Sequence, residues 1–292
     1  MPKHLTEQQI TRYRADGFLH PFEAFSSAQA AKYRDHIDAY EKQIGGSAMG
    51  FKGKYRANPH LLCPWADTLV RLPSIVDLVE DLIGPDILLF SSRFFIKEPH
   101  SPENAAWHQD APYIGLRPYD AVYAWVAISD VPLESGPLEL LKGSHIRGFL
   151  DHKANMVEHS LTASGQAIVD KIDMSARETV VLKAGQFSFH HTCCAHQSGA
   201  NNSDIRRIGI ALNYIPTHVR HYGPGPMPAT LIRGEDTYRH FDLKPSPKTN
   251  FDDEAVACHA QAFEIWNRNY FEQMRRADAH DTPSSPGAAV PA

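Results

Sequence analysis

Residues 107–110, Trp-His-Gln-Asp, place a histidine and a carboxylate two positions apart. On an extended strand, side chains at i and i+2 point to the same face, so His108 and Asp110 can reach one metal ion. Two histidines and one carboxylate can hold one face of Fe(II) and leave the opposite positions open for other ligands. The spacing therefore predicts a mononuclear metal site whose third ligand comes from a distant strand.

A histidine two residues before an acid is by itself a weak signal. With 17 histidines and 34 acidic residues among 292, chance produces roughly two such triplets. The chain has three, at His36/Asp38, His108/Asp110 and His240/Asp242. The first lies in an expected helix, where i and i+2 do not face each other, and the third lies late, in a segment of helix and tail. Only the second is followed, at long range, by a histidine and an arginine on a strand-like run, His196 and Arg207.

The run from Arg207 to Ile215 contains a residue suited to a carboxylate ligand, because arginine presents a planar fork of donors. Alternation on a strand puts Arg207, Gly209, Ala211 and Asn213 on one face, and small residues beside an inward arginine leave room for a ligand. Arg206 then faces the surface. His190 and His191 compete with His196 as metal ligands, whereas Cys193 and Cys194 are expected in the core, since iron oxygenase sites prefer nitrogen and oxygen donors.

The composition is that of a globular protein, with 42% hydrophobic and 22% charged residues. A net charge of −5 provides no general attraction to nucleic acid or anionic membrane. No run approaches ~18 apolar residues, and the N-terminus lacks the apolar core of a signal peptide. The four cysteines form no Cys-x-x-Cys pattern, so a reducing, cytoplasmic location is expected.

The N-terminal part, residues 5–84, is expected to be helical. Thr6 with Gln9 forms a capping box and Gly17 ends that helix, while Ser26 opens a second helix that runs to about Ile44. A short helix spans 73–82, and residues 47–66 have no clear period. A C-terminal helix is expected over 252–277, followed by a disordered tail over 278–292.

The middle of the chain consists of short runs rich in β-branched and aromatic residues. They cover 87–97, 122–131, 139–141, 179–182, 187–191 and 207–215, and turns separate them. Strands without alternating helices indicate an antiparallel jelly roll or cupin-like barrel. We therefore expect one mainly β domain over 1–277 with flanking helices and a β core at about 87–217.

Several motifs occur in a characteristic order: Trp107-His108-Gln109-Asp110, Ala124-Trp125-Val126-Ala127, Gly136-Pro137-Leu138 with Gly143-Ser144-His145, residues 185–191, and His196-Gln197-Ser198-Gly199 followed by Arg207. Together they resemble the phytanoyl-CoA dioxygenase family over roughly residues 5–245. Details resemble most its bacterial small-molecule branch of hydroxylases and halogenases. The resemblance implies a double-stranded β-helix core, Fe(II), 2-oxoglutarate as cosubstrate, and O2.

Carried over to this sequence, the resemblance implies His108, Asp110 and His196 as iron ligands. It implies that Arg207 grips the distal carboxylate of 2-oxoglutarate, and that Gln109, Trp125 and Ser198 touch the same cosubstrate. The implied reaction is hydroxylation with release of succinate and CO2.

Other functions stay open from the sequence. A halogenase on the same fold has a small residue where Asp110 stands, which favours hydroxylation, whereas desaturation or cyclisation uses the same ligands. A cupin-like binding protein or a zinc hydrolase can also use two histidines and a carboxylate, but needs no grip on an oxo acid by Arg207.

The expected substrate is a small, polar, acid-bearing metabolite, amino-acid-like or phosphonate-like. The candidate anion partners are Lys52, Lys54, Arg56, Arg93 and Arg117, and Trp107 and Tyr113 are candidates for shaping the pocket. No nucleic acid or membrane partner is expected, and the substrate's identity and the oligomeric state are left open.

Overall fold

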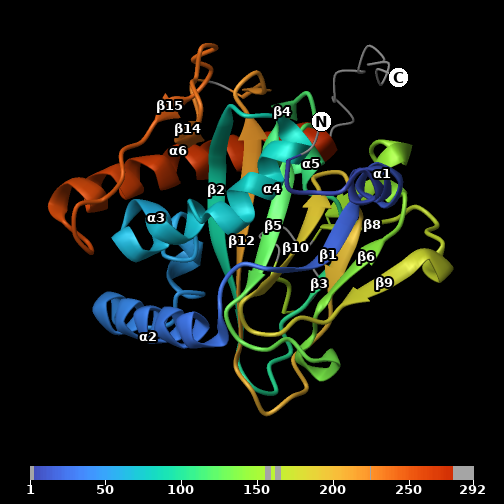
Figure 1. The fold of residues 1–292 in the computed structure, drawn as a ribbon, viewed down its shortest axis with the longest axis horizontal. Helices are drawn as coiled ribbons and strands as arrows, with labels where there is room; N and C mark the ends of the chain where they lie inside the picture. The colour runs from blue at the N-terminus through green and yellow to red at the C-terminus, as the bar shows by residue number, and fades with distance from the viewer. Residues whose placement is uncertain (1–2, 155–158, 162–165, 224, 279–292) are drawn as a thin grey trace.

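Two antiparallel sheets dominate the computed structural model, which describes residues 3–154, 159–161, 166–223 and 225–278 (Figure 1). The main sheet contains, in spatial order, β1 (Phe18–Glu23), β10 (Gln186–His191), β5 (Val122–Ala127), β12 (Arg207–Pro216), β2 (Ile87–Lys97), β14 (Pro228–Arg233) and β15 (Asp242–Leu243). Only the β14–β15 pair in it is parallel. The second sheet contains β3 (Ala105–His108), β11 (His196–Ser198), β6 (Leu138–Leu141) and β9 (Arg177–Val180). The expected jelly-roll architecture is thereby confirmed.

Smaller elements complete the β structure. β4 (Leu116–Arg117) pairs with β13 (Arg220–His221), and β7 (His152–Ala154) pairs with β8 (Gln166–Ile168). The main sheet extends beyond the expected core of 87–217, because β1 joins one side of it and β14 and β15 join the other. Strand β1 lies within the part expected to be helical, and its partner β10 lies more than 160 residues away in the sequence.

The helices begin and end where local signals place them. α1 (Glu7–Asp16) has the full Thr6–Gln9 capping box, and α2 (Ser27–Ile44) begins at the Ser26 cap. Gly17 and Gly45 end them at φ of 85° and 76°, in the left-handed region that glycine adopts without strain. The others are α3 (Pro64–Val70), α4 (Pro73–Ile83), α5 (Ala111–Ile114) and α6 (Asp253–Asp278). α3 was not expected; it begins at the end of the stretch 47–66, which shows no clear period, and runs beyond it.

Short 3-10 helices lie at Phe51–Gly53, Pro59–Leu61, Leu133–Ser135, Ser144–Arg147 and Met174–Ala176. The expected disordered tail lies, from residue 279 onward, outside the described residues. Among the described residues, no helix combines the length and hydropathy needed to span a membrane.

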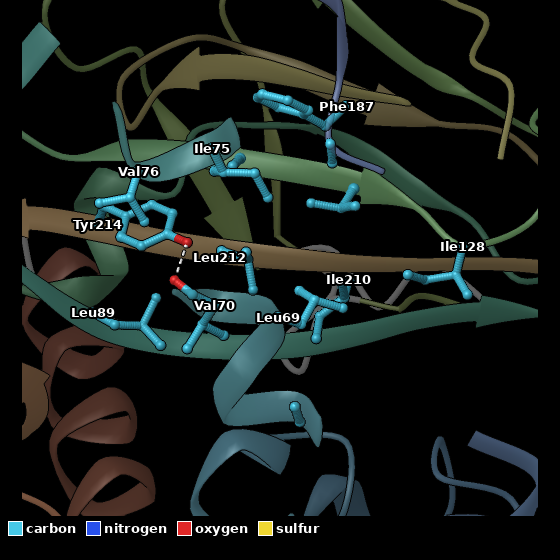
Figure 2. Close-up of a cluster of buried hydrophobic side chains, with 14 of the residues drawn as sticks. Leu69, Val70, Ile75, Val76, Leu89, Ile128, Phe187, Ile210, Leu212 and Tyr214 are labelled. Carbon is cyan, nitrogen blue, oxygen red and sulfur yellow. Dashed lines mark hydrogen bonds between the residues drawn. The ribbon is translucent and has the colours of Figure 1, made fainter. Parts of the chain in front are cut away.

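One face of the main sheet packs against helices α1 to α4 and forms the largest hydrophobic core. In Figure 1, α2 and α3 lie beside β2 and β12, and α4 crosses over the sheet. Figure 2 shows Leu69 and Val70 of α3 and Ile75 of α4 against Leu212 and Tyr214 of β12. The Tyr214 hydroxyl donates a hydrogen bond of 2.8 Å to the Val70 carbonyl, so this large side chain is buried without an unpaired polar atom. We call this face of the main sheet the helix-packed face.

The opposite face of the main sheet carries the alternate residues and turns toward the second sheet. Strand register aligns Arg207 with Lys97, Ala211 with both Arg93 and Trp125, and Asn213 with Tyr123. This face, called here the cavity face, is rich in polar and cationic side chains although it is largely buried. Since strand residues alternate between faces, the same strands supply both the core and the site.

Candidate active site

His108, Asp110 and His196 converge on one point at an edge of the second sheet. The antiparallel register of β3 and β11 puts His196 directly opposite His108. Asp110 lies two residues after the end of β3, at the N-terminus of α5, with φ −77° and ψ −35°. The two side chains therefore meet at the point where β3 ends and the chain turns into α5. Their potential ligand atoms all lie within 4.8 Å of one another.

Backbone carbonyls orient both imidazole rings. Nδ1 of His108 lies 2.7 Å from the Ala106 carbonyl and Nδ1 of His196 lies 2.9 Å from the Cys194 carbonyl. Each Nδ1 must carry the proton and donate, which leaves the Nε2 lone pair free for a metal. These Nε2 atoms lie 3.8 and 3.9 Å from the carboxylate oxygens of Asp110.

The electrostatics of this cluster favour a bound cation. Burial holds the pKa of His108 well below its usual value, so the ring is neutral, and burial raises the pKa of Asp110. A buried carboxylate beside neutral imidazoles is costly unless a positive ion compensates it. Two nitrogens and one carboxylate match the donor set of a non-haem Fe(II) site, so these residues fit iron. Within the described part of the chain, this is the one group of three histidine, cysteine or acidic side chains able to hold a metal.

Arg207 is a buried cation without a protein counterion. It is only 1% exposed, and no described carboxylate pairs with it. Its Nη1 donates to the Gly136 carbonyl, its Nε has no partner, and its guanidinium lies 5.4 Å from the centroid of the Trp125 ring. Burial lowers the pKa of Arg207 to about 9, so the group is still charged at neutral pH. An unpaired buried guanidinium in a cavity fits the carboxylate of a bound 2-oxo acid.

Gly209 has a different role from the one expected. A Cβ at this position would lie 2.1 Å from the Trp125 ring, so the glycine makes room for that indole rather than for a ligand. Ala211 does line the cavity. As expected, Arg206 faces away from the cavity and forms ion pairs with Glu41 and Glu98.

Two of the three residues expected around the cosubstrate line the cavity, namely Trp125 and Ser198. Gln109 does not. Its amide nitrogen donates to the carbonyls of Gly148 and Cys193, and its oxygen accepts from the Leu150 backbone, so it holds two loops together. This corrects the expectation of a direct contact, because all hydrogen-bonding atoms of the Gln109 side chain are already used by backbone groups.

Lys97 was not recognised from the sequence as a site residue. It is fully buried, lies opposite Arg207, and donates to Ser198 Oγ at 3.0 Å and to the Gly199 carbonyl. Burial lowers its pKa to about 6. Strand alternation could have indicated this role, because it puts Lys97 on the same face of β2 as Arg93.

The cluster and Arg207 line one cavity of about 110 Å³, and Arg56, Arg93 and Tyr113 line it as expected. Four other candidates do not. Lys52 is exposed, Lys54 lies over the Tyr55 ring, Trp107 packs in a separate cluster with Leu150, and Arg117 stacks on Tyr119 at 4.2 Å. Each of these side chains contacts a local partner or solvent. A position near aromatic residues in the sequence therefore did not predict which side chains line the cavity.

Further residues line the cavity; the sequence did not point to Tyr123, Trp266 or Tyr270, and it offered His190 only as a rival metal ligand. Tyr123 and His190 stack with their ring centroids 5.1 Å apart, and His190 lies 4.9 Å from His196. Trp266 and Tyr270 come from α6, one helical turn apart, with ring centroids at 5.1 Å. Aromatic residues at i and i+4 are the ordinary pattern of a packed helix, so nothing local distinguished these two from core residues.

Comparisons with known proteins agree with this geometry. A family model described as phytanoyl-CoA dioxygenase matches residues 13–209. The chain is 30% identical over 158 residues to a probable alpha-ketoglutarate-dependent hypophosphite dioxygenase of Stutzerimonas stutzeri, an alignment that covers 54% of this chain and 55% of that protein. It is 26% identical to L-proline trans-4-hydroxylase of Streptomyces griseoviridis, over 70% of this chain and 84% of that protein. The solved structure of a non-heme monooxygenase, ThoJ, superposes with a TM-score of 0.81 at 34% identity, over 91% of this chain and 99% of that chain.

Proposed function

The chain belongs to the phytanoyl-CoA dioxygenase family of iron- and 2-oxoglutarate-dependent oxygenases, and from this premise we propose that it hydroxylates a small, polar, acid-bearing metabolite. The products would be the alcohol, succinate and CO2. One observation carries the proposal. A two-histidine, one-carboxylate cluster shares a cavity with Arg207, a buried arginine that has no counterion among the described residues. A hydrolase or a simple metal-binding cupin has no use for that second feature.

In this proposal, His108, Asp110 and His196 hold the iron through two nitrogens and one oxygen. Iron together with 2-oxoglutarate and O2 supplies the oxidising power that no protein side chain has. Arg207 binds the far carboxylate of the cosubstrate through its fork of donors. Its contact with Gly136 holds the guanidinium in place before the ligand arrives, so little freedom is lost on binding.

Residues around the guanidinium support the same role. Ser198 lines the cavity and already accepts a hydrogen bond from Lys97, so its own proton is available for a carboxylate oxygen. The Trp125 ring covers one side of Arg207 and excludes water from it. In a water-poor environment, the attraction between a guanidinium and a carboxylate is stronger than in bulk solvent.

The substrate side of the cavity favours a small anion. Arg56 and Arg93 line it, and a cavity of about 110 Å³ has room for roughly eight waters at about 12 Å³ each. The similar proteins named for hypophosphite and for L-proline act, by their names, on small polar compounds.

The test is succinate formation by the purified protein with Fe(II), 2-oxoglutarate and O2. A panel of small anionic metabolites is compared with neutral lipids and acyl-CoA thioesters. We expect succinate above the substrate-free background with members of the anionic set, and none when iron is omitted or in the Asp110→Ala variant. Turnover confined to lipids or thioesters would contradict the substrate class, and turnover that does not need 2-oxoglutarate would contradict the reaction.

A further inference from the structure

The charges that line the cavity do not balance. Among the described residues that line it, the ionised side chains are Arg56, Arg93 and Arg207 against the single carboxylate of Asp110. If the proposed function holds, the two positive charges of iron offset the two carboxylates of 2-oxoglutarate. Two positive charges of the protein are then left without compensation. Since buried charges are found paired, the substrate is expected to bring two negative charges.

Arg93 is placed to meet such a substrate. It projects from the cavity face of β2 opposite Ala211, whose small side chain leaves space above it. Its guanidinium lies 4.5 Å from the centroid of the Trp266 ring and close enough to Asp110 to interact with its charge. No hydrogen bond or ion pair joins its side chain to any residue that the structure describes. Once Asp110 is bound to iron, that carboxylate no longer neutralises the arginine.

Arg56 reaches the same region from a loop. Its Nε donates to the Phe94 carbonyl at 2.9 Å and its Nη1 to the Leu161 carbonyl at 2.8 Å, so the side chain is held rigidly. Its guanidinium lies 4.4 Å from the centroid of the Phe95 ring. Phe95 and Arg93 are alternate residues on one strand face, roughly 7 Å apart along β2. Two arginines that repel each other therefore lie within reach of one compact group.

Three aromatic rings of the cavity already have a protein cation beside them. Trp266, Phe95 and Trp125 each have a guanidinium over the ring, from Arg93, Arg56 and Arg207 respectively. A quaternary ammonium ligand would have to share these rings with like charges, which costs free energy.

We propose that Arg93 and Arg56 form a binding site for a phosphonate group on the substrate. Phosphonate is compact, carries two charges, and offers three oxygens to two arginine forks. A monocarboxylate would neutralise only one of the two guanidinium groups. A dicarboxylate would spread its charges beyond the short span between them. Arg93 and Arg207 are four positions apart in the β2–β12 register, roughly 13 Å along the strands, so Arg93 is separate from the arginine proposed for the cosubstrate.

The test uses the full chain loaded anaerobically with Fe(II) and 2-oxoglutarate, so that no turnover occurs. Calorimetry measures the Kd of ethylphosphonate and of propionate at pH 8, where a phosphonate, like a phosphate monoester above its second pKa of about 6, carries close to two charges. We expect ethylphosphonate to bind at least tenfold more tightly than propionate. In Arg93→Met, the affinity for ethylphosphonate should fall about ten- to a hundredfold, because a charge-assisted pair is lost. Arg206→Met, a matched change on the surface, should leave both Kd values unchanged.

Two measurements keep the outcomes separate. Arg93→Lys retains a charge without the fork and should bind ethylphosphonate with intermediate affinity, so a loss in Arg93→Met caused by misfolding would be recognised. The 2-oxoglutarate affinity of Arg93→Met should equal that of the wild type, which separates this site from the cosubstrate site. Equal binding of ethylphosphonate and propionate, no ethylphosphonate binding, or an unchanged Kd in Arg93→Met would overturn the proposal. None of these results would affect the iron and 2-oxoglutarate sites, whose failure would instead appear as loss of 2-oxoglutarate binding in the wild type.

Discussion

The two faces of the main sheet are built from the same strands and differ in almost every physical respect. On β12, Ile210, Leu212 and Tyr214 pack into the helix-packed face. The Tyr214 hydroxyl has a hydrogen-bond partner there, the Val70 carbonyl (Figure 2). Two residues of the same strand on the cavity face, Arg207 and Asn213, are as deeply buried but keep side-chain atoms without partners among the described residues.

This difference separates the residues that stabilise the fold from those that bind ligands. Apolar burial contributes roughly 25 cal/mol per Å² and needs no ligand. Buried polar atoms without partners cost free energy until a ligand supplies those partners. The main sheet can therefore keep most of its stability on the helix-packed face and carry ligand-ready polar groups on the cavity face. Substitutions on the two faces should accordingly change different measurements.

The largest effect is expected where the cavity face meets the metal cluster. His108→Ala, Asp110→Ala and His196→Ala should each lower succinate production by at least about a hundredfold, because two remaining ligands hold iron poorly. Thermal melting should show a folded protein, since none of these side chains belongs to the helix-packed face. His240→Ala, from a His-x-Asp triplet outside the cluster, is the matched control and should keep its activity. Full activity of a cluster variant under saturating Fe(II) would remove that residue from the site.

The next largest effect is expected from a substitution that leaves an empty space in the core of the helix-packed face. Leu212→Ala should lower the free energy of unfolding by about 2–5 kcal/mol, because a fully buried leucine is truncated among α3 and α4. The 2-oxoglutarate affinity of the folded variant should not change. Urea unfolding measures the first quantity and calorimetry the second, with the 63% exposed Leu133→Ala as the control for stability. Loss of ligand affinity in folded Leu212→Ala would show that the two faces are coupled.

The converse change lies on the cavity face of the same strand. Arg207→Ala should weaken the binding of 2-oxoglutarate by about 1.5–3 kcal/mol, or roughly ten- to a hundredfold in affinity. The loss of stability should be small, because the charge that is removed has no counterion among the described residues. Its neighbour Arg206→Ala should leave 2-oxoglutarate affinity within about twofold, since that side chain pairs with Glu41 on the surface. Titration of both anaerobic Fe(II) proteins with 2-oxoglutarate decides the point. The reverse result would place the cosubstrate on the other face of β12.

A smaller effect should appear as a dependence of stability on pH. His60 lies buried behind β2, bonds Ser92 and Thr230, and burial lowers its pKa to about 3. In the unfolded chain His60 has an ordinary histidine pKa near 6.5, so as pH falls the unfolded state takes up a proton before the folded state does. The stability that neutral His60 provides is therefore fully present above pH ~6.5 and is lost as pH falls toward 3. Between pH 7.5 and 5.5 the loss should be about 1 kcal/mol. Urea unfolding should show a flatter pH dependence in His60→Gln than in the wild type, and identical slopes would mean that folded His60 titrates normally.

Sequence patterns were enough for features that depend on neighbouring residues. The caps at Thr6 and Ser26, the glycine that ends each of the first two helices, and the apolar runs of the strands all act within a few residues. The jelly-roll class followed from strands without alternating helices. The pairing of His108 with Asp110 was also visible locally, because the two residues belong to one short motif.

Tertiary structure alone decided which distant residues meet. The register of β3 with β11 puts His196, and not His191, opposite His108. Of the candidate cations outside β12, only Arg56 and Arg93 face the cavity. Register and loop direction depend on contacts between segments up to about two hundred residues apart, and no local propensity encodes them. For the same reason, the sequence did not indicate that Trp266 of α6 lines the cavity. An aromatic residue in the core and one that lines a cavity have the same local sequence pattern and differ only in what lies beyond the ring.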